Sequence, residues 1–168
     1  MTSLRQTSLL KETRIIYCAD SSTFIDLNRR GHPIDTFPTL WGNIDMLIDN
    51  GRIIAPKESL RELAVGDDQL FRWAKARKKL FIAPDEAHQD ALRQIMSKFP
   101  NCIKTGTTGV FADPWVVALA VVNECTVLTY EKSEPNNPNS NKIPDICNAF
   151  GVKCMHPFDM MRVEGWKF

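Results

Sequence analysis

The sequence predicts an α/β fold, in which helices cover a central, mostly parallel sheet of about four to five strands. Short apolar runs typical of buried parallel strands alternate with segments in which apolar residues recur at helical spacing. The chain has 168 residues, a length that suits one domain with a substantial core. Strands that alternate with helices form right-handed crossovers and place helices on both faces of the sheet. We therefore expect a three-layer α/β/α arrangement.

Each element is expected from its own local pattern. The strands are predicted at residues 14–19, 53–55, 126–130 and 152–155. Three helices are predicted where apolar side chains recur every three or four positions, at residues 40–48, 70–80 and 91–99. Asn50-Gly51 ends the first of these helices, and Pro100 ends the third. Two further helices are expected to begin near Ser22 and at Asp113.

The composition is that of an ordinary globular protein. Apolar residues make up 43% of the chain and charged residues 24%, and no apolar run is long enough to cross a bilayer. Residues 1–13 lack the apolar core of a secretory signal, so we expect a polar, poorly ordered lead-in and a cytoplasmic protein. Residues 14–168 are expected to form a single domain. With a net charge of +1, any binding of nucleic acid must use a local basic face.

Cysteine usage argues against two structural devices. The five cysteines are odd in number and never form a Cys-x-x-Cys pair. This pattern is unlike a disulfide framework or a zinc ribbon. We expect buried free thiols instead.

Carboxylates recur where the predicted parallel strands end. Asp20 follows the first strand, and Glu62 stands in a short helix after the second. Asp113 opens the helix before the third strand, and Glu131 follows that strand. Because sites in parallel sheets form outside the carboxyl ends of the strands, we expect these side chains to converge on one edge.

A carboxylate cluster with too few histidines or cysteines for a zinc site indicates a hard divalent cation. Mg²⁺ and Mn²⁺ prefer oxygen ligands and can activate a water for attack on a phosphodiester.

Each acid also has a simpler explanation. Asp20 and Asp113 could each cap a helix, the latter with Pro114 in the first turn. Glu62 could lie on a surface, although Glu58 one turn away makes that placement slightly unfavourable, and Glu131 could simply be a loop residue.

These residues belong to motifs that resemble the PIN-domain nucleases, in particular a less characterised PIN-like subgroup with relatives among VapC-type toxins. The resemblance covers about residues 15–161. Its motifs, in order, are Tyr17-Cys-Ala-Asp20-Ser-Ser-Thr-Phe-Ile-Asp-Leu27, Ile54-Ala-Pro-Lys-Glu-Ser-Leu-Arg-Glu62-Leu63, Ala112-Asp113-Pro-Trp-Val-Val-Ala-Leu-Ala120 and Val127-Leu-Thr-Tyr-Glu131. The resemblance implies a PIN-like fold and Mg²⁺- or Mn²⁺-dependent cleavage of RNA.

The resemblance also implies roles for individual residues. Asp20 matches the first metal-binding Asp, Glu62 the acid of the second motif and Asp113 the Asp that opens the helix. The family's Thr-x-Asp motif appears as Thr-Tyr-Glu131, a departure that adds one methylene. Asp145 is a rival for this fourth metal-binding position, although it could equally stabilise the first turn of a short helix.

Hydroxyls and one lysine complete the predicted site. Ser21, Ser22 and Thr129 are candidates to orient the carboxylates, with turn and cap roles as the alternative for the serines. Lys104, which precedes Asp113 in a glycine-containing stretch, is a candidate phosphate contact, although a surface turn explains it as well.

The functional hypothesis is a metal-dependent endoribonuclease that hydrolyses RNA with a carboxylate-bound cation and an activated water. The resemblance implies two protein partners, a cognate antitoxin and a second copy in a homodimer. The alternative is a catalytically inactive PIN-like domain that serves as a protein or RNA interaction module. The sequence argues against a phosphatase of the haloacid-dehalogenase type, because Ser22 stands where that class needs a second Asp.

Overall fold

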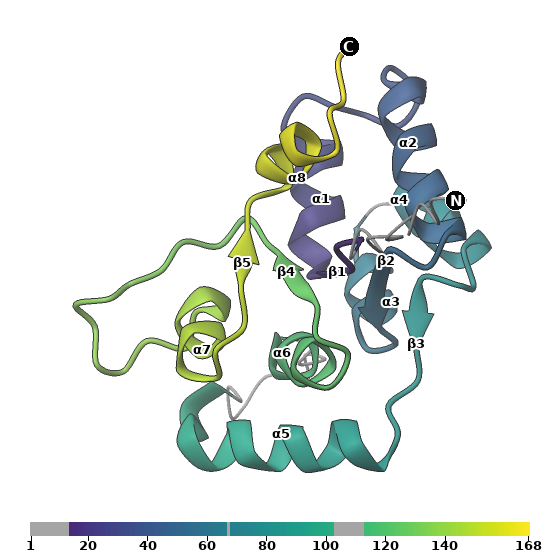
Figure 1. Cartoon of the computed structure of the whole chain (residues 1–168). Helices are drawn as coiled ribbons and strands as arrows, with labels where there is room; N and C mark the ends of the chain where they lie inside the picture. The colour runs from purple at the N-terminus through teal and green to yellow at the C-terminus, as the bar shows by residue number, and fades with distance from the viewer. Residues whose placement is uncertain (1–13, 67, 103–112) are drawn as a thin grey trace, which may run out of the picture.

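The computed structural model describes residues 14–66, 68–102 and 113–168, in which strands and helices alternate along the chain (Figure 1). The predicted lead-in, residues 1–13, lies outside this range. The strands are β1 (Tyr17–Ala19), β2 (Ile53–Pro56), β3 (Phe81–Ile82), β4 (Thr126–Leu128) and β5 (Cys154–Met155). The helices are α1 (Ser21–Arg29), α2 (Pro38–Asp49), α3 (Ser59–Leu63), α4 (Asp68–Ala76), α5 (Glu86–Lys98), α6 (Asp113–Val122), α7 (Ile143–Ala149) and α8 (Pro157–Val163), with a 3₁₀ turn, η1 (Pro100–Cys102).

The predicted three-layer α/β/α fold is confirmed. Five strands form one sheet in the order β3-β2-β1-β4-β5, and every pair is parallel. Alternate residues of β1 enter two separate cores, because successive side chains of a strand point to opposite faces. Tyr17 and Ala19 pack with residues of α1, α2, α4 and α8, whereas Cys18 packs with residues of α5, α6 and α7. The two helical layers lie on opposite sides of the sheet (Figure 1).

The strand order creates a switch point beside β1. The chain builds outward from β1 to β2 and β3, and then returns to place β4 on the other side of β1. At such a point the connections leave the sheet in opposite directions, and a crevice opens outside the carboxyl ends of the two strands. Asp20 is the first residue after β1 and therefore lies at this crevice.

Helix α6 lies between the sheet and α5 (Figure 1), and it contacts β1, β2, β4 and α5. Its middle residues, from Pro114 to Ala120, are nearly all buried, which explains why the segment is apolar around its circumference. Because α6 leads into β4 and packs back along the sheet, its N-terminus lies at the carboxyl edge of the strands. Asp113, the first residue of α6, is thereby brought to the switch point.

Several predicted boundaries need correction. The helix predicted at residues 70–80 ends at Ala76. Leu80 lies beyond it, in the turn that leads into β3, and its carbonyl accepts a hydrogen bond from the Ala55 amide. Leu80 is fully buried, so its apolar character reflects packing of that turn. The strand β3 was missed because its two residues are too few to form a pattern. The strands predicted at 14–19 and 126–130 are three residues long, β1 and β4.

In the part of the chain that the structure describes, no helix combines the length and apolarity that a membrane span requires. The most apolar helix, α6, has ten residues.

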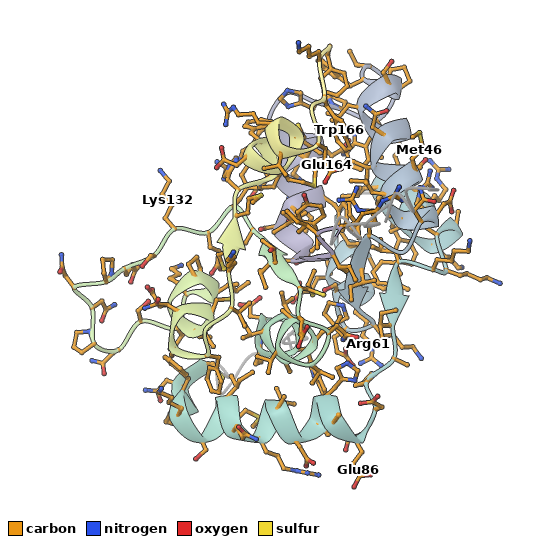
Figure 2. The ribbon with its side chains drawn as sticks, in the orientation of Figure 1. Met46, Arg61, Glu86, Lys132, Glu164 and Trp166 are labelled. Carbon is orange, nitrogen blue, oxygen red and sulfur yellow. The ribbon has the colours of Figure 1, made fainter. Side chains whose placement is uncertain are left out.

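A polar network ties α8 to the amino end of the sheet. Glu164, labelled near α8 in Figure 2, accepts hydrogen bonds from the Tyr17 hydroxyl at 2.7 Å and from two Arg52 nitrogens at 2.7 and 2.6 Å. The side chains of Arg52 and Glu164 are 17% and 12% exposed, so the ion pair is largely removed from water. Hydrogen bonds from Arg52 lower the pKa of Glu164, and burial opposes this shift only in part.

We predict that Glu164→Gln lowers the free energy of unfolding at neutral pH by about 2 kcal/mol, because a charged hydrogen-bonded partner of Arg52 and Tyr17 is lost. A carboxylate whose pKa is depressed by folding stabilises the protein above its unfolded pKa of about 4.3. That contribution disappears as the pH falls through the lower folded pKa. The difference between wild type and Glu164→Gln should therefore shrink in acid, as measured by urea denaturation at several pH values.

The matched control is Asp159→Asn on the same helix, where Asp159 pairs with Arg162 on the surface. This substitution should cost less than about 1 kcal/mol. Equal losses for the two variants would contradict the anchoring role of Glu164.

Candidate functional site

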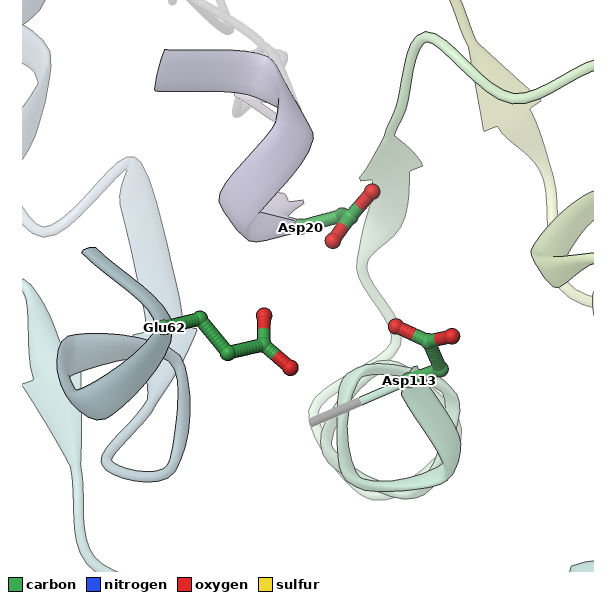
Figure 3. A group of neighbouring side chains, drawn as sticks. All are labelled: Asp20, Glu62 and Asp113. Carbon is green, nitrogen blue, oxygen red and sulfur yellow. The ribbon is translucent and has the colours of Figure 1, made fainter. Parts of the chain in front are cut away.

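Three predicted acids converge at the switch point. Asp20, Glu62 and Asp113 each offer a carboxylate oxygen, and these oxygens lie within 4.8 Å of one another. Figure 3 shows the three side chains directed toward a common space from the start of α1, from α3 and from the start of α6. Within residues 14–66, 68–102 and 113–168, this is the one such group of three or more metal-ligating side chains. We refer to it as the carboxylate triad.

Asp20 is the most buried member of the triad, with 3% of its surface exposed. Its position follows from the sheet, because its backbone amide donates to the Leu128 carbonyl at 2.9 Å and extends the pairing of β1 with β4 by one residue. Burial raises the pKa of Asp20, since the charged form loses its hydration, and hydrogen bonds from hydroxyls oppose the rise in part. Burial next to two further acids therefore disfavours the charged form of Asp20, and a positive partner would offset this effect.

Two hydroxyls hold one oxygen of Asp20 in place. The Ser22 hydroxyl donates to Asp20 Oδ2 at 2.5 Å, and the Thr129 hydroxyl donates to the same atom at 2.9 Å. Each hydroxyl oxygen in turn accepts a backbone amide, Ser22 from Tyr130 at 3.2 Å and Thr129 from Glu131 at 3.1 Å. Because the amides occupy acceptor positions on the hydroxyls, the hydroxyl protons are directed at Asp20. The contact predicted for these two hydroxyls is thus present.

Ser21 links two members of the triad. Its hydroxyl lies within hydrogen-bonding distance of Asp20 Oδ1, at 3.3 Å, and of Glu62 Oε2. A single hydroxyl proton serves one acceptor at a time, so Ser21 can favour Glu62 while Asp20 Oδ1 keeps the longer contact. Ser21 and Glu62 lie 41 positions apart in the sequence, so no local pattern predicts this contact.

The ends of two helices set the electrostatics of the triad. Asp20 occupies the N-cap position of α1, but its side chain makes no capping hydrogen bond, so the simple capping explanation does not account for it. Asp113 lies in the first turn of α6, where the helix dipole favours negative charge. These positive helix ends compensate only part of the charge of three carboxylates.

Glu131 and Asp145 do not join the carboxylate triad. Glu131 accepts the amide of Ile143 at 2.8 Å and so binds the N-terminus of α7. Asp145 accepts the Glu134 amide at 2.9 Å and the hydroxyls of Ser133 and Ser140. Partial burial acts to raise the pKa of Asp145, but these hydrogen bonds outweigh it and lower the pKa. Both residues hold the loop between β4 and α7, and their assignment as metal ligands stays a prediction.

Lys104, the predicted phosphate contact, lies outside the described residues, and its role also stays a prediction.

The cysteines agree in part with the expectation of buried thiols. Four of the five are buried and Cys154 is exposed, and none forms a disulfide.

The residues of the triad fit a hard divalent cation. All three side chains present carboxylate oxygens, the ligand type that such a cation prefers, and these oxygens lie within 4.8 Å of one another. A Mg²⁺ or Mn²⁺ ion would also offset the burial of Asp20 and the mutual repulsion of the acids. Burial of Asp20 and the close grouping of the three acids are more typical of a cation site than of surface carboxylates.

Comparisons with known proteins agree with this architecture. The sequence profile of a family described as a domain of unknown function (DUF4411) matches residues 17–168. No curated protein matches the sequence.

Two solved structures are similar in fold. One is a chain from the crystal structure of VapBC2 from Rickettsia felis bound to a DNA fragment from their promoter, with 14% identity and a TM-score of 0.50 over 84% of this chain and 98% of that one. The other is a chain from the crystal structure of FitAcB from Neisseria gonorrhoeae, with 16% identity and a TM-score of 0.50 over 85% and 99%. At these identities the likeness concerns the fold alone, and it confirms the PIN-like fold implied by the sequence resemblance.

We predict that Asp20→Asn makes the metal-free protein more stable, by about 1 kcal/mol, because it removes the buried charge that faces Glu62 and Asp113. An Asn side chain can still accept from Ser22 and Thr129. In Mn²⁺ the wild type should become more stable than Asp20→Asn, since a cation that binds the folded wild type but not the variant stabilises only the wild type. Urea denaturation in EDTA and in Mn²⁺ measures both effects.

Asp26→Asn is the control, because Asp26 lies on the same helix and pairs with Arg30 outside the triad. It should respond to Mn²⁺ as the wild type does. A destabilised Asp20→Asn in EDTA would show that the hydroxyl contacts alone satisfy the carboxylate.

Proposed function

The chain belongs to the family described as a domain of unknown function (DUF4411), and we propose that it is a metal-dependent endoribonuclease of PIN type. The observation that carries the proposal is the carboxylate triad, whose oxygens lie within 4.8 Å of one another at the switch point of a PIN-like sheet. RNA as the substrate follows from the resemblance of the four sequence motifs to PIN-domain nucleases. We also propose that residues 14–168 form one domain, and the family profile matches residues 17–168.

Asp20, Glu62 and Asp113 are the proposed ligands of Mg²⁺ or Mn²⁺. A bound divalent cation supplies charge neutralisation for a phosphodiester and lowers the pKa of an attacking water. Ser22 and Thr129 fix the orientation of Asp20, so that one of its oxygens is held by hydroxyls while the other faces the remaining acids. Ser21 restrains Glu62 in the same way. The proposed catalytic role of Glu131 rests on its place in the fourth motif.

The burial of the triad limits how a substrate can reach it. The triad lies where β1 and β4 end between the two helical layers, and Asp20 is almost fully buried. A phosphodiester can approach from the outer side of the triad, where Glu62 and Asp113 are partly exposed. Cleavage therefore requires an RNA segment that can enter a crevice, which favours single-stranded or distorted regions.

The decisive experiment is cleavage of a mixed RNA pool with and without Mn²⁺, comparing wild type with Asp20→Asn and Glu62→Gln. Wild type should cleave only with the metal, and each variant should lose at least about 100-fold in rate, because transition-state charge is no longer stabilised. Asp26→Asn, a carboxylate on the same helix outside the triad, should retain the wild-type rate.

Full activity of Asp20→Asn would refute the assignment of the triad. The absence of both RNA cleavage and carboxylate-dependent Mn²⁺ binding by calorimetry would refute the metal site and favour the inactive interaction module. Mn²⁺ binding with no cleavage of any RNA would leave the metal site standing and refute the ribonuclease.

We further propose that a cognate antitoxin restrains the activity and that the protein forms a homodimer. Support for the antitoxin comes from the resemblance to VapC-type toxins and from the fold shared with a chain of VapBC2. The homodimer rests on the family resemblance. Lys104 keeps its proposed role as a phosphate contact.

Expression of the wild type without a partner should arrest bacterial growth, because uncontrolled RNA cleavage stops translation. Asp20→Asn expressed to the same level should permit growth, while Asp26→Asn should arrest it. Growth curves with matched protein levels measure the effect. Normal growth with abundant, RNA-cleaving wild type would contradict the toxin proposal and leave the ribonuclease proposal intact.

A further inference from the structure

A cavity of about 340 Å³ lies beside the carboxylate triad, between the segments that follow β4 and β5. Three stretches of chain line it, namely residues 129–133 after β4, Pro144 in the first turn of α7, and residues 154–156 of β5 and its end. We call it the β4–β5 pocket. Its volume is at the small end of the range for small-molecule sites, about 300–1,000 Å³. A single planar ring system is the size of group that such a pocket accepts.

The β4–β5 pocket shares a residue with the triad. Thr129 lines the pocket, and its hydroxyl donates to Asp20 Oδ2 at 2.9 Å. Because parallel strands end at the same edge of a sheet, the pocket opens on the edge where the triad lies. A chain molecule whose phosphate lies at the triad therefore brings its neighbouring groups to the pocket.

The lining combines apolar surface with a few polar groups. Pro144 and Met155 supply apolar contacts, and Ser133 supplies a hydroxyl. Lys132 is exposed, and Figure 2 shows it extending from the loop after β4. A nucleobase has this combination of flat apolar faces and polar edges, whereas a phosphate alone would make no use of the apolar surface.

His156 is a fixed polar group in this lining. Its Nδ1 accepts the Phe158 amide at 3.2 Å, which leaves Nε2 as the N–H donor of the neutral ring. Its ring also packs edge-on against Tyr130, with centroids 4.5 Å apart and an interplanar angle of 73°. A ring held from two directions can discriminate between partners, because it cannot rotate to suit each of them.

The loop that forms the other wall is held by the two acids outside the triad. Glu131 accepts the Ile143 amide, and Asp145 accepts the Ser133 hydroxyl and the Glu134 amide. These contacts join residues 131–134 to the start of α7. The pocket thus has a preorganised wall, which reduces the entropy cost of binding.

We propose that the β4–β5 pocket binds the nucleobase of a nucleotide adjacent to the scissile phosphate and makes cleavage depend on base identity. This inference rests on the proposed RNA cleavage, and it adds the feature that selects the cleavage position. Lys132 and His156 supply hydrogen-bond donors for the acceptor atoms of the base, and Pro144 and Met155 contact its faces.

Cys154 provides a direct test of occupancy. It lines the pocket and is the exposed member of the five cysteines, whereas the other four are buried. The experiment measures the rate at which iodoacetamide alkylates Cys154 of the wild type in EDTA, by mass spectrometry. Each of the four nucleoside 5′-monophosphates is added at saturation, and ribose 5-phosphate is the control without a base. At least one nucleotide should slow alkylation about fivefold or more, and ribose 5-phosphate should not.

A matched pair of variants tests the link to cleavage. Cys154→Trp fills the pocket, whereas Cys154→Ser keeps it open, and neither residue belongs to the triad. Sequencing the ends of RNA fragments should show the same base preference for Cys154→Ser as for wild type, and a weakened preference for Cys154→Trp.

The outcomes separate the two proposals. If no nucleotide protects Cys154 while wild type cleaves RNA with Mn²⁺, the base pocket is refuted and the ribonuclease stands. An unchanged preference in a folded Cys154→Trp also refutes the pocket. Protection that ribose 5-phosphate matches would mean a phosphate site and refutes base recognition. Protection by a nucleotide alone, in a protein that cleaves no RNA, would support base binding by the pocket but refute both the ribonuclease and the role of the pocket in cleavage.

Discussion

The carboxylate of Asp20 lies at the carboxyl end of the central strand, almost fully buried, and the surrounding structure is arranged to keep it there. Hydroxyls of Ser22 and Thr129 donate to one of its oxygens, and backbone amides after β4 fix those hydroxyls. A buried charge of this kind is costly unless it is paired. The hydrogen bonds oppose only part of that cost, and a divalent cation shared with Glu62 and Asp113 would offset the rest.

The short strand β1 holds Asp20 in position because both ends of the strand are anchored. At its amino end, the Tyr17 hydroxyl joins the ion pair of Arg52 and Glu164, which brings α8 against the sheet. At its carboxyl end, Asp20 continues the pairing with β4 through its own amide. Two residues, Cys18 and Ala19, lie between the anchors Tyr17 and Asp20, so the strand has little freedom to shift. Contacts at the amino end of the sheet thereby help to fix Asp20 at its carboxyl end.

The triad and the β4–β5 pocket are parts of one surface, joined by the segment that follows β4. Thr129 contacts Asp20 and also lines the pocket, and the next residues lead into the loop held by Glu131 and Asp145. An acid near a catalytic centre need not bind metal to matter for the reaction. In this fold, carboxylates outside the triad shape the wall against which a substrate group would rest.

Local patterns in the sequence predicted the α/β class, most of the helices and the three acids that the structure groups in the triad, because periodicity and strand-end position are local properties. It could not reveal β3, whose two residues form no pattern, or the true end of α4, since the burial of Leu80 arises from packing of a turn. The partners of Glu131 and Asp145 were also hidden, because they depend on how the loop folds against α7. The four motifs made Ser21 and Thr129 candidates to orient the carboxylates, but the fold decides which carboxylate each hydroxyl contacts, since Ser21 lies 41 positions from Glu62 and Thr129 lies 109 positions from Asp20.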